Sequence, residues 1–141
     1  MNPLQRLLVF AFVRVHTALF RLTDGRIGGR MGPQRILLLT TTGRASGRPR
    51  TVPLTYFEDG ERLVIIASAG GAARDPAWWR NLQAQPEALV QLAGERRRVR
   101  ARIASAEERA RLWPRVKREN PAYAAYEKRT AREIPVVLLA T

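Results

Sequence analysis

Short apolar runs separated by turn signals dominate this sequence from residue 36 to its end. Most of them are too short for an ordinary helix and rich in Val, Ile, Leu and Thr, which is typical of buried strands. Tight turns such as Asp59-Gly60 between successive runs predict hairpins. The expected strands are therefore mostly antiparallel, and they cover residues 36–41, 51–57, 62–68, 87–93, 96–104 and 134–139.

Helical patterns fill the gaps between these runs. The order of elements is helix, three strands, helix, two strands, two helices and a strand, which predicts an α+β fold. A small, mostly antiparallel split β-barrel is the most plausible plan, because closure removes exposed sheet edges. We expect an N-terminal amphipathic helix with a Gly-rich loop over residues 1–32 and the barrel domain over 33–141. The expected helices are 1–23, 75–85 with Asp75 as its cap, 105–119 with a Ser105–Glu108 capping box and a kink at Pro114, and 121–130.

The charge balance points to an anionic partner. Lys and Arg total 25 against 12 Asp and Glu, giving a formal net charge of +13. An excess this large attracts nucleic acid, acidic lipid or a polyanionic small molecule. The chain has no Cys and one His, which excludes a disulfide scaffold, thiol catalysis and a Cys- or His-rich metal site. Redox chemistry would therefore have to come with a bound cofactor.

Residues 1–23 combine an apolar helix surface with a narrow polar stripe. The longest uncharged apolar run, 7–13, is far shorter than the ~20 residues of a membrane span. Two interpretations stay open: a helix packed along the domain, or a basic amphipathic helix at an acidic membrane surface. His16 is expected at the helix surface or the edge of the core. The polar stripe consists of Arg6, Arg14, Thr17 and Arg21.

A basic loop, TGRASGRPR, joins the first two strands at residues 42–50. Its three guanidinium groups can bind phosphate or carboxylate oxygens in bidentate fashion. Its glycines let backbone amides approach a ligand closely, and its hydroxyl groups add neutral donors. The loop is thus interpreted either as an anion-binding cradle or as a solvated basic hairpin loop.

Two further stretches contain aromatic pairs. Trp78 and Trp79 follow a small-residue loop and lie about 100° apart on a helix. We therefore expect only one of them in the core, with the other either half-exposed or forming the wall of a site for a flat ligand. Tyr123 and Tyr126 share one helix face. Their phenols either pack only, or donate hydrogen bonds or a proton to a substrate oxygen.

Together these stretches resemble the deazaflavin-dependent nitroreductase family of split β-barrel oxidoreductases. The motifs are TTTGRASGRPRTVPL, ASAGGAARDPAWWRNL and NPAYAAYEKRTAREIPVVLL, and the resemblance covers residues 33–140. Members use coenzyme F420, a flat deazaflavin with a phosphate and an oligoglutamate tail. The resemblance implies a cytoplasmic F420H2-dependent oxidoreductase that transfers a hydride to a quinone, nitro compound or enone.

The resemblance also implies roles for individual residues, and no metal. Cofactor phosphate and tail would be held by Arg44, Ser46, Gly47, Arg48 and Arg50. The ring would lie along Val52, Pro53, Ala67, Ser68, Gly70 and Trp78. The acceptor would meet Ser68, Tyr123 and Tyr126, with a phenol as proton donor. Three positions differ from some members of the family: Ala45 and Ala69, where Lys or Arg occurs, and Asn120, where a third aromatic occurs.

Other ligands and partners remain open at this stage. The same barrel could hold FMN, haem or another tetrapyrrole, or act as a carrier without catalysis. A nucleic-acid-binding module is disfavoured, because the basic strand face of Arg98, Arg100 and Arg102 has no interleaved aromatic residue and reads as solvated surface. Beyond a small redox acceptor, the expected partners are an acidic membrane at the inner face of the cell membrane and a second copy in a homodimer.

Overall fold

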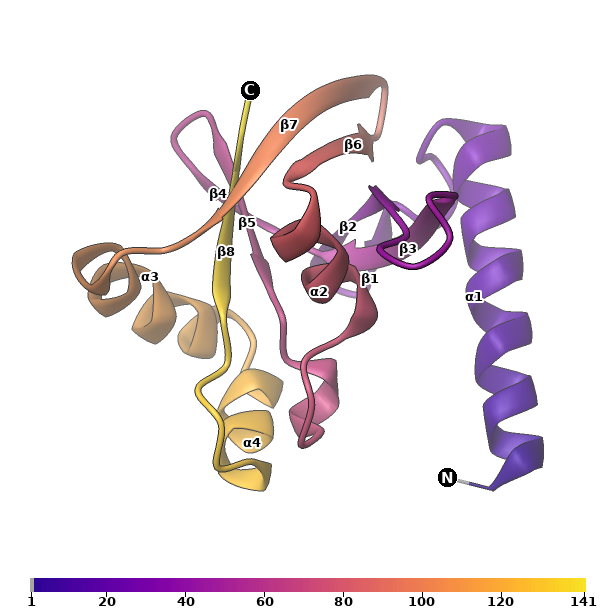
Figure 1. Cartoon of the computed structure of the whole chain (residues 1–141). Helices are drawn as coiled ribbons and strands as arrows, with labels where there is room; N and C mark the ends of the chain where they lie inside the picture. Colours follow the sequence, from indigo (N-terminus) through magenta and orange to yellow (C-terminus); the bar gives the residue numbers. More distant parts are fainter. Residues whose placement is uncertain (1) are drawn as a thin grey trace.

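The computed structural model describes residues 2–141. Each strand pairing in this range is antiparallel, as the hairpin signals predict. The elements (Figure 1) are α1 (Pro3–Thr23), β1 (Arg30–Met31), β2 (Gln34–Thr42), β3 (Pro49–Thr55), β4 (Phe57–Asp59), β5 (Arg62–Ile66), the short 3-10 helix η1 (Ala69–Gly71), α2 (Ala77–Ala84), β6 (Glu87–Leu92), β7 (Glu95–Ile103), α3 (Ala106–Glu119), α4 (Ala122–Arg129) and β8 (Val136–Ala140).

The strands form a curled half-barrel, which confirms the predicted α+β split-barrel plan. Strand order is β1-β2-β6-β7-β8-β5-β4, and β3 pairs with β2 outside this path. The strand β3 thus pairs only with β2 among the described strands, as Pro53 predicts, because proline has no N–H to donate to a ladder and is confined to edge strands or bulges. The helices α3 and α4 lie together at one side of the sheet, and α1 stands at the other (Figure 1).

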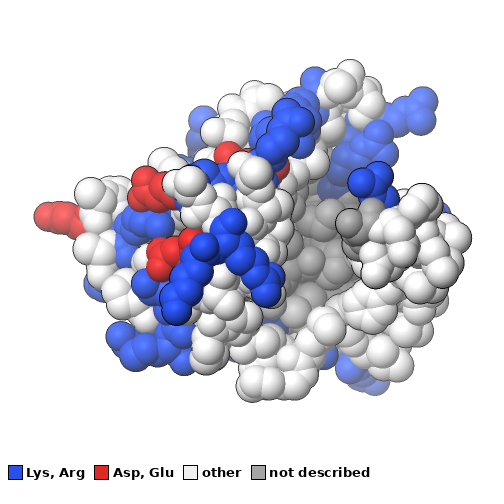
Figure 2. Space-filling view, turned by 90° about the horizontal axis from the view of Figure 1, so that it is seen from below, with Lys and Arg blue, Asp and Glu red and all other residues white. Residues whose placement is uncertain are grey.

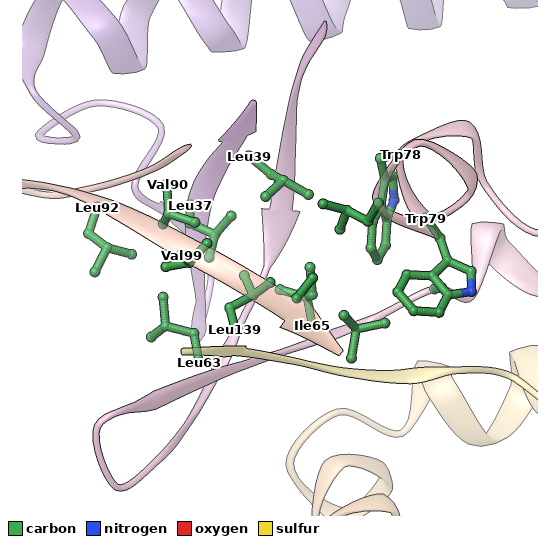
Figure 3. Close-up of a cluster of buried hydrophobic side chains, with 14 residues drawn as sticks. Leu37, Leu39, Leu63, Ile65, Trp78, Trp79, Val90, Leu92, Val99 and Leu139 are labelled. Carbon is green, nitrogen blue, oxygen red and sulfur yellow. The ribbon is translucent and has the colours of Figure 1, made fainter. Parts of the chain in front are cut away.

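Two hydrophobic clusters share the strands β5 and β8. Side chains at alternate positions point to opposite faces, so Leu63 and Ile65 join one cluster while Val64 and Ile66 join the other. Burial on both faces explains why these strands read as continuous apolar runs. The first cluster lies inside the curl and is capped by α2 (Figure 3). The second lies beneath α3 and α4 and includes Leu112, Trp113, Val116 and Tyr123.

Two expectations about α2 are wrong. Trp78 and Trp79 are 7% and 6% exposed and belong to the same hydrophobic cluster. Figure 3 shows both rings at one end of this cluster. A concave sheet meets more than one flank of a short helix, so both tryptophans reach the same core. Asp75 does not cap α2, whose N-cap is Pro76. Its carboxylate instead accepts a hydrogen bond from Arg132 at 2.9 Å.

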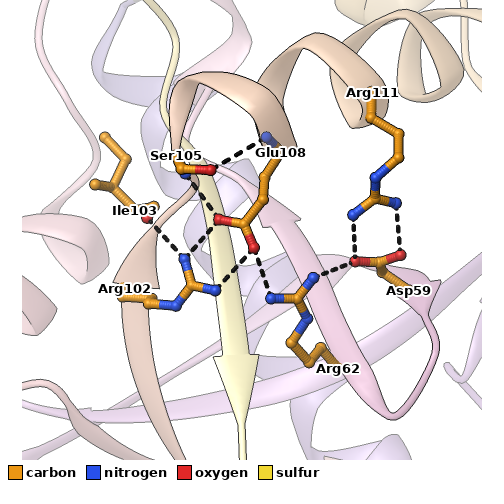
Figure 4. Close-up of polar contacts among 7 residues, drawn as sticks. All are labelled: Asp59, Arg62, Arg102, Ile103, Ser105, Glu108 and Arg111. Atoms are coloured by element: carbon orange, nitrogen blue, oxygen red, sulfur yellow. Dashed lines mark hydrogen bonds and ion pairs between the residues drawn. The ribbon is translucent and has the colours of Figure 1, made fainter.

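The predicted capping box of α3 is present and extends into an ion cluster (Figure 4). Glu108 accepts hydrogen bonds from Ser105 N, Arg62 and Arg102, and Asp59 accepts from Arg62 and Arg111. These guanidinium groups lower the pKa of Asp59 to about 2 and hold that of Glu108 far below its usual range. The ion cluster thus joins α3 to β4, β5 and β7. The helix α3 itself continues past Pro114 to Glu119.

The basic face of β7 is therefore not merely solvated. Arg102 pairs with Glu108, and Arg100 pairs with Glu87. Val99 and Ala101 are buried as the alternation predicts, whereas Ile103 at the strand end is 56% exposed. Neighbouring carboxylates thus neutralise much of this face.

The N-terminal helix α1 has the predicted extent but buries little of itself. A capping box between Asn2 and Gln5 opens it, and its buried residues are His16 and Phe20. His16 lies at the core edge, where its Nε2 is 2.7 Å from the carbonyl oxygen of Gly28. By length and composition alone, α1 could also cross a membrane. Its exposed large apolar side chains are Leu4, Leu7, Leu8, Val9, Phe10, Phe12, Val15, Leu19 and Leu22.

Candidate functional site: a basic groove beside the half-barrel

A groove of about 1030 Å³ separates α1 from the half-barrel. Its walls are α1 on one side and β3, the loop before it and α2 on the other. In Figure 2 the surface is hollowed between the largely white part at the right, where α1 is viewed near its N-terminal end, and the rest of the molecule. The groove thus brings residues of the first helix against the basic loop of residues 43–48.

Internal hydrogen bonds shape the basic loop. Gly43 N donates to Arg48 O at 2.8 Å, and Gly47 N donates to Gly43 O at 2.8 Å. Gly47 has a φ of +70°, which favours glycine. A Cβ on Gly43 would lie 2.7 Å from Ser46 Oγ, so a larger residue there would disturb the turn. The loop is therefore held in a shape that presents Arg44 and Arg48 to the groove.

A buried asparagine on α2 anchors the loop. Asn81 is 4% exposed, and its Oδ1 accepts from Arg44 N at 3.2 Å and from Arg44 Nη1 at 2.9 Å. Its Nδ2 donates to Thr41 Oγ1 at 3.1 Å. No sequence motif assigns a role to Asn81. The available signal was its position three residues after Trp78, which places both on one helix face.

The second wall of the groove comes from α1. Arg21 Nη2 donates to Thr51 Oγ1 at 2.8 Å, and Thr51 shares a 2.7 Å hydrogen bond with Thr40. Arg14 and Thr17 also line the groove. Three of the four residues of the polar stripe on α1 therefore line the groove.

The groove is positively charged and has no carboxylate in its lining. Its guanidinium groups belong to Arg14, Arg21, Arg44, Arg48 and Arg50. Within residues 2–141 none of these five forms an ion pair, whereas the acids of the sheet pair with arginines elsewhere. The Oγ1 atom of Thr17 is buried without a hydrogen-bond partner among the described residues. Such a site favours an anion with several oxygen atoms.

The structure brings together about half of the residues that the family resemblance implies. Arg44, Ser46, Arg48, Arg50, Val52 and Trp78 line the groove. Gly47 belongs to the same loop, and Pro53 lies opposite Leu38 in the ladder between β2 and β3. The remaining residues lie outside the lining of the groove, where the loop after β5 approaches α4: Ala67, Ser68, Gly70, Tyr123 and Tyr126.

The two tyrosines differ in their surroundings. Their rings are 5.7 Å apart and almost perpendicular. Tyr123 is 7% exposed, and burial raises its pKa to about 12 against the opposing effect of a hydrogen bond with Thr55. Tyr126 is half-buried at the edge of the same cluster. Of the two phenols, that of Tyr126 is thus the one that a substrate can approach.

Arg132 organises the loop after β5, a role that no sequence motif predicts. Its guanidinium donates to the carbonyl oxygens of Ala67, Ser68 and Ala72 at 3.2, 2.8 and 2.9 Å. Its remaining contact is the carboxylate of Asp75. Nothing local distinguishes Arg132 from the chain's many other arginines, because its partners lie about 60 residues earlier. This side chain holds the backbone around Ser68 in place.

The curled antiparallel half-barrel is the split β-barrel fold of a solved F420-H2 dependent reductase, and this protein is an oxidoreductase of that class. Residues 12–141 match the family described as F420H(2)-dependent quinone reductase. The chain belongs to that family, which confirms the class of protein and the cofactor type that the motifs imply.

Individual relatives agree with this assignment. An F420H(2)-dependent quinone reductase of Mycobacterium tuberculosis strain H37Rv is 41% identical over 140 residues, which cover 96% of this chain and 94% of the relative. The structure of the F420-H2 dependent reductase FDR-A is 37% identical with a TM-score of 0.68, covering 74% of this chain and 93% of that chain. A domain-swapped dimer is 34% identical with a TM-score of 0.71, covering 89% of this chain and 96% of that chain.

Proposed function

We propose that this protein binds coenzyme F420 in the groove and catalyses F420H2-dependent reduction of a quinone. The observation behind this proposal is the set of five arginines without carboxylate partners around one groove. Nitro compounds and enones are alternative acceptors of the same reaction type. No observation favours FMN, haem or nucleic acid as the ligand.

The residues present fit F420. Its phosphate and carboxylate tail match the guanidinium groups of the loop, while Val52 and Trp78 offer apolar surface for a flat ring. When bound, reduced F420 supplies a hydride to the acceptor. The chain's own part is to fix the anionic tail, orient the ring, exclude water and donate a proton.

Ser68 and Tyr126 are the residues that we assign to the acceptor. Ser68 is 8% exposed, and Arg132 holds its backbone. Gly71, in the same loop, packs so closely on α4 that an added Cβ would lie 2.7 Å from Tyr126 O. The loop and the tyrosine helix therefore form one unit that can present a hydroxyl and a phenol to a reducible oxygen. Tyr123 supports this unit from the core.

The direct test is titration of the full chain with F420, followed by oxidation of F420H2 in the presence of a soluble quinone and a nitro compound. We expect saturable F420 binding and faster oxidation with the quinone. FMN, haem and a DNA duplex at physiological salt are the comparison ligands. Preference for any of these over F420 would contradict the proposal.

We further propose that α1 holds the protein at the inner face of the cell membrane, near a lipid-borne quinone. The supporting feature is the outward apolar face of α1, where Leu8, Val15 and Leu22 are 60%, 58% and 84% exposed. Insertion of such a face into the interfacial region stabilises membrane association in proportion to the buried apolar area. Since Arg14 and Arg21 face the groove, apolar contacts contribute more than the basic stripe does.

Vesicle co-sedimentation tests the membrane proposal. The double variant Leu8→Glu/Val15→Glu should bind phosphatidylglycerol-containing vesicles much less than the wild type. Gln83→Glu/Gln85→Glu adds the same charge at exposed positions of α2 and the turn after it, and should bind nearly as well as the wild type. Equal binding of both variants would reject the proposal. A dimer held by α1 would instead appear as a change in mass by light scattering.

A further inference from the structure

We propose that α1 forms half of the anion site: Arg14 and Arg21 hold the phosphate and glutamate tail of F420 from the side opposite Arg44, Arg48 and Arg50. This inference rests on the proposed function. It assigns a ligand-binding role to a helix that lies outside the three motifs of the family resemblance.

The spacing of the α1 residues fits a continuous wall. Thr17, Ala18 and Arg21 follow Arg14 by three, four and seven positions, so the four residues lie on one helix face. His16 and Phe20 lie on a neighbouring face, which is buried against the domain. The outward apolar residues occupy the remaining surface. A single helix thus presents a buried face, a cationic face and an apolar face.

The position of this wall is fixed by contacts of the second half of α1. Phe20 is fully buried, and the His16 ring contacts the Gly28 carbonyl at 2.7 Å. Arg21 donates to Thr51 on β3 at 2.8 Å, which joins the helix directly to the opposite wall. An added Cβ on Gly28 would lie 2.7 Å from the His16 ring, so this loop fits the helix closely.

Ordinary structural roles do not account for both arginines. Arg21 lies in the last turn of α1, where a cation interacts favourably with the helix dipole. Arg14 lies two turns earlier and gains nothing from that dipole. Its guanidinium carbon lies 5.4 Å from the centre of the Phe10 ring, and among residues 2–141 it forms no ion pair. No carboxylate lines the groove to neutralise either residue.

Thr17 gives an independent indication of a ligand. Its Oγ1 is buried in the groove wall between Arg14 and Arg21 without a hydrogen-bond partner among residues 2–141. A buried hydroxyl without a partner is costly, and rotation of the Thr17 side chain about its Cα–Cβ bond would let an anionic oxygen in the groove accept its proton. The same anion would relieve the repulsion among the five guanidinium groups.

The experiment compares two probes on the full-length protein. One probe is F420, and the other is its deazaflavin core lacking the phosphate and the tail. Arg14→Ala and Arg21→Ala should each weaken F420 binding about tenfold, the usual size of a charge-assisted hydrogen bond. Neither substitution should change the binding of the deazaflavin probe that lacks the phosphate and the tail. Arg6→Ala is the matched control, because Arg6 belongs to the same polar stripe but not to the groove lining.

Two further measurements separate binding from folding. Arg21→Gln keeps a donor for Thr51 but removes the charge, so it should weaken F420 binding as Arg21→Ala does, without loss of helix by circular dichroism. In limited trypsin digestion, F420 should protect the bonds after Arg14 and Arg21 but not the bond after Arg6.

The outcomes distinguish this inference from the proposed function. Wild-type protein that fails to bind F420 would overturn both. Wild-type binding that Arg14→Ala and Arg21→Ala leave unchanged would overturn the role of α1 alone. Equal weakening of both probes would also overturn it, because the arginines would then act on the ring or on the fold.

Discussion

Asn81 shows how one buried side chain can set the charge of a binding site. Its amide oxygen accepts two hydrogen bonds from Arg44 while remaining neutral, so the guanidinium keeps its full charge for a ligand. A carboxylate in the same place would pair with Arg44 and cancel that charge. The neutral amide is therefore important to the basic character of the groove.

Asn81→Asp tests this interpretation with almost no change in shape. The variant keeps an acceptor for Arg44, but it adds a negative charge and loses the donor to Thr41. We expect F420 affinity to fall about tenfold or more in fluorescence titration. Asn81→Ala removes the hydrogen bonds without adding charge, and should lower thermal stability more than affinity. Greater F420 affinity in Asn81→Asp would contradict the interpretation.

The tyrosine pair leads to a second prediction at the residue scale. Tyr126→Phe should lower the turnover of F420H2 oxidation by about two orders of magnitude or more while leaving F420 affinity nearly unchanged, since general acid catalysis contributes about 10²–10⁴-fold. The comparison variant is Tyr123→Phe, which removes a phenol whose pKa is raised to about 12 by burial. It should mainly change the melting temperature. Parallel losses of turnover and affinity in Tyr126→Phe would exclude the proton-donor role.

The contact between η1 and α4 determines how the Ser68 loop meets the tyrosine helix. Gly71 has a φ of +85°, and a Cβ there would lie 2.7 Å from the carbonyl oxygen of Tyr126. Gly71→Ala should therefore destabilise the fold by about 2 kcal/mol or more, combining backbone strain with a clash. Gly60→Ala meets no atom within 4 Å at a φ of +62° and should lose only about 1 kcal/mol. Chemical denaturation measures both, and equal losses would contradict the clash.

The ion cluster that holds α3 predicts a dependence of stability on pH. The pKa of Asp59 falls from 3.8 to about 2, so its contribution is complete above pH 4. As the pH falls from about 4 to about 2, the Asp59 carboxylate becomes protonated and loses its ion pairs with Arg62 and Arg111. Its contribution to the free energy of unfolding therefore disappears. The free energy of unfolding should therefore decrease over this window. Asp59→Asn should flatten the decrease, and an unchanged slope in that variant would assign it to other carboxylates.

For the molecule as a whole, the net charge of +13 resolves into distinct populations. Arginines on β5, β7 and α3 are largely paired with carboxylates of the same domain, as Figure 4 shows for one cluster. The five groove arginines form no such ion pairs among the described residues. The groove therefore collects five guanidinium groups without carboxylate partners at one site, whereas the other unpaired basic side chains are distributed over the rest of the described surface.

This distribution predicts selectivity between polyanions. Binding to duplex DNA should be weak at physiological salt and fall steeply as salt rises, because two of the three arginines on the outer face of β7, Arg100 and Arg102, already pair with carboxylates. F420 binding should depend less on salt, since in the proposed site the anionic tail would lie between two cationic walls, where charges are screened less than at an open surface. A gel-shift assay and an F420 titration in matched buffers measure the two. Tight DNA binding that resists salt would contradict this picture.

The proposed two-part division at residue 32 also belongs to this scale. Sequence composition favours such a boundary, and the Gly-rich loop lies there. Yet the groove takes one wall from each part, with α1 on one side and β3 with its loop on the other. The first helix is therefore part of the site geometrically, even though the division itself remains a prediction.

Sequence alone determined the features that depend on neighbours in the chain. Strand runs, the Asp59-Gly60 turn, the capping box of α3 and the basic loop follow from local periodicity and turn chemistry, as do the motifs that indicate the family. Tertiary structure decided which surfaces meet. Both tryptophans share one core, Asp75 pairs with Arg132 rather than capping α2, and the stripe on α1 faces the groove. These contacts join segments far apart in sequence, and their energies depend on the curl of the sheet, which no local pattern specifies.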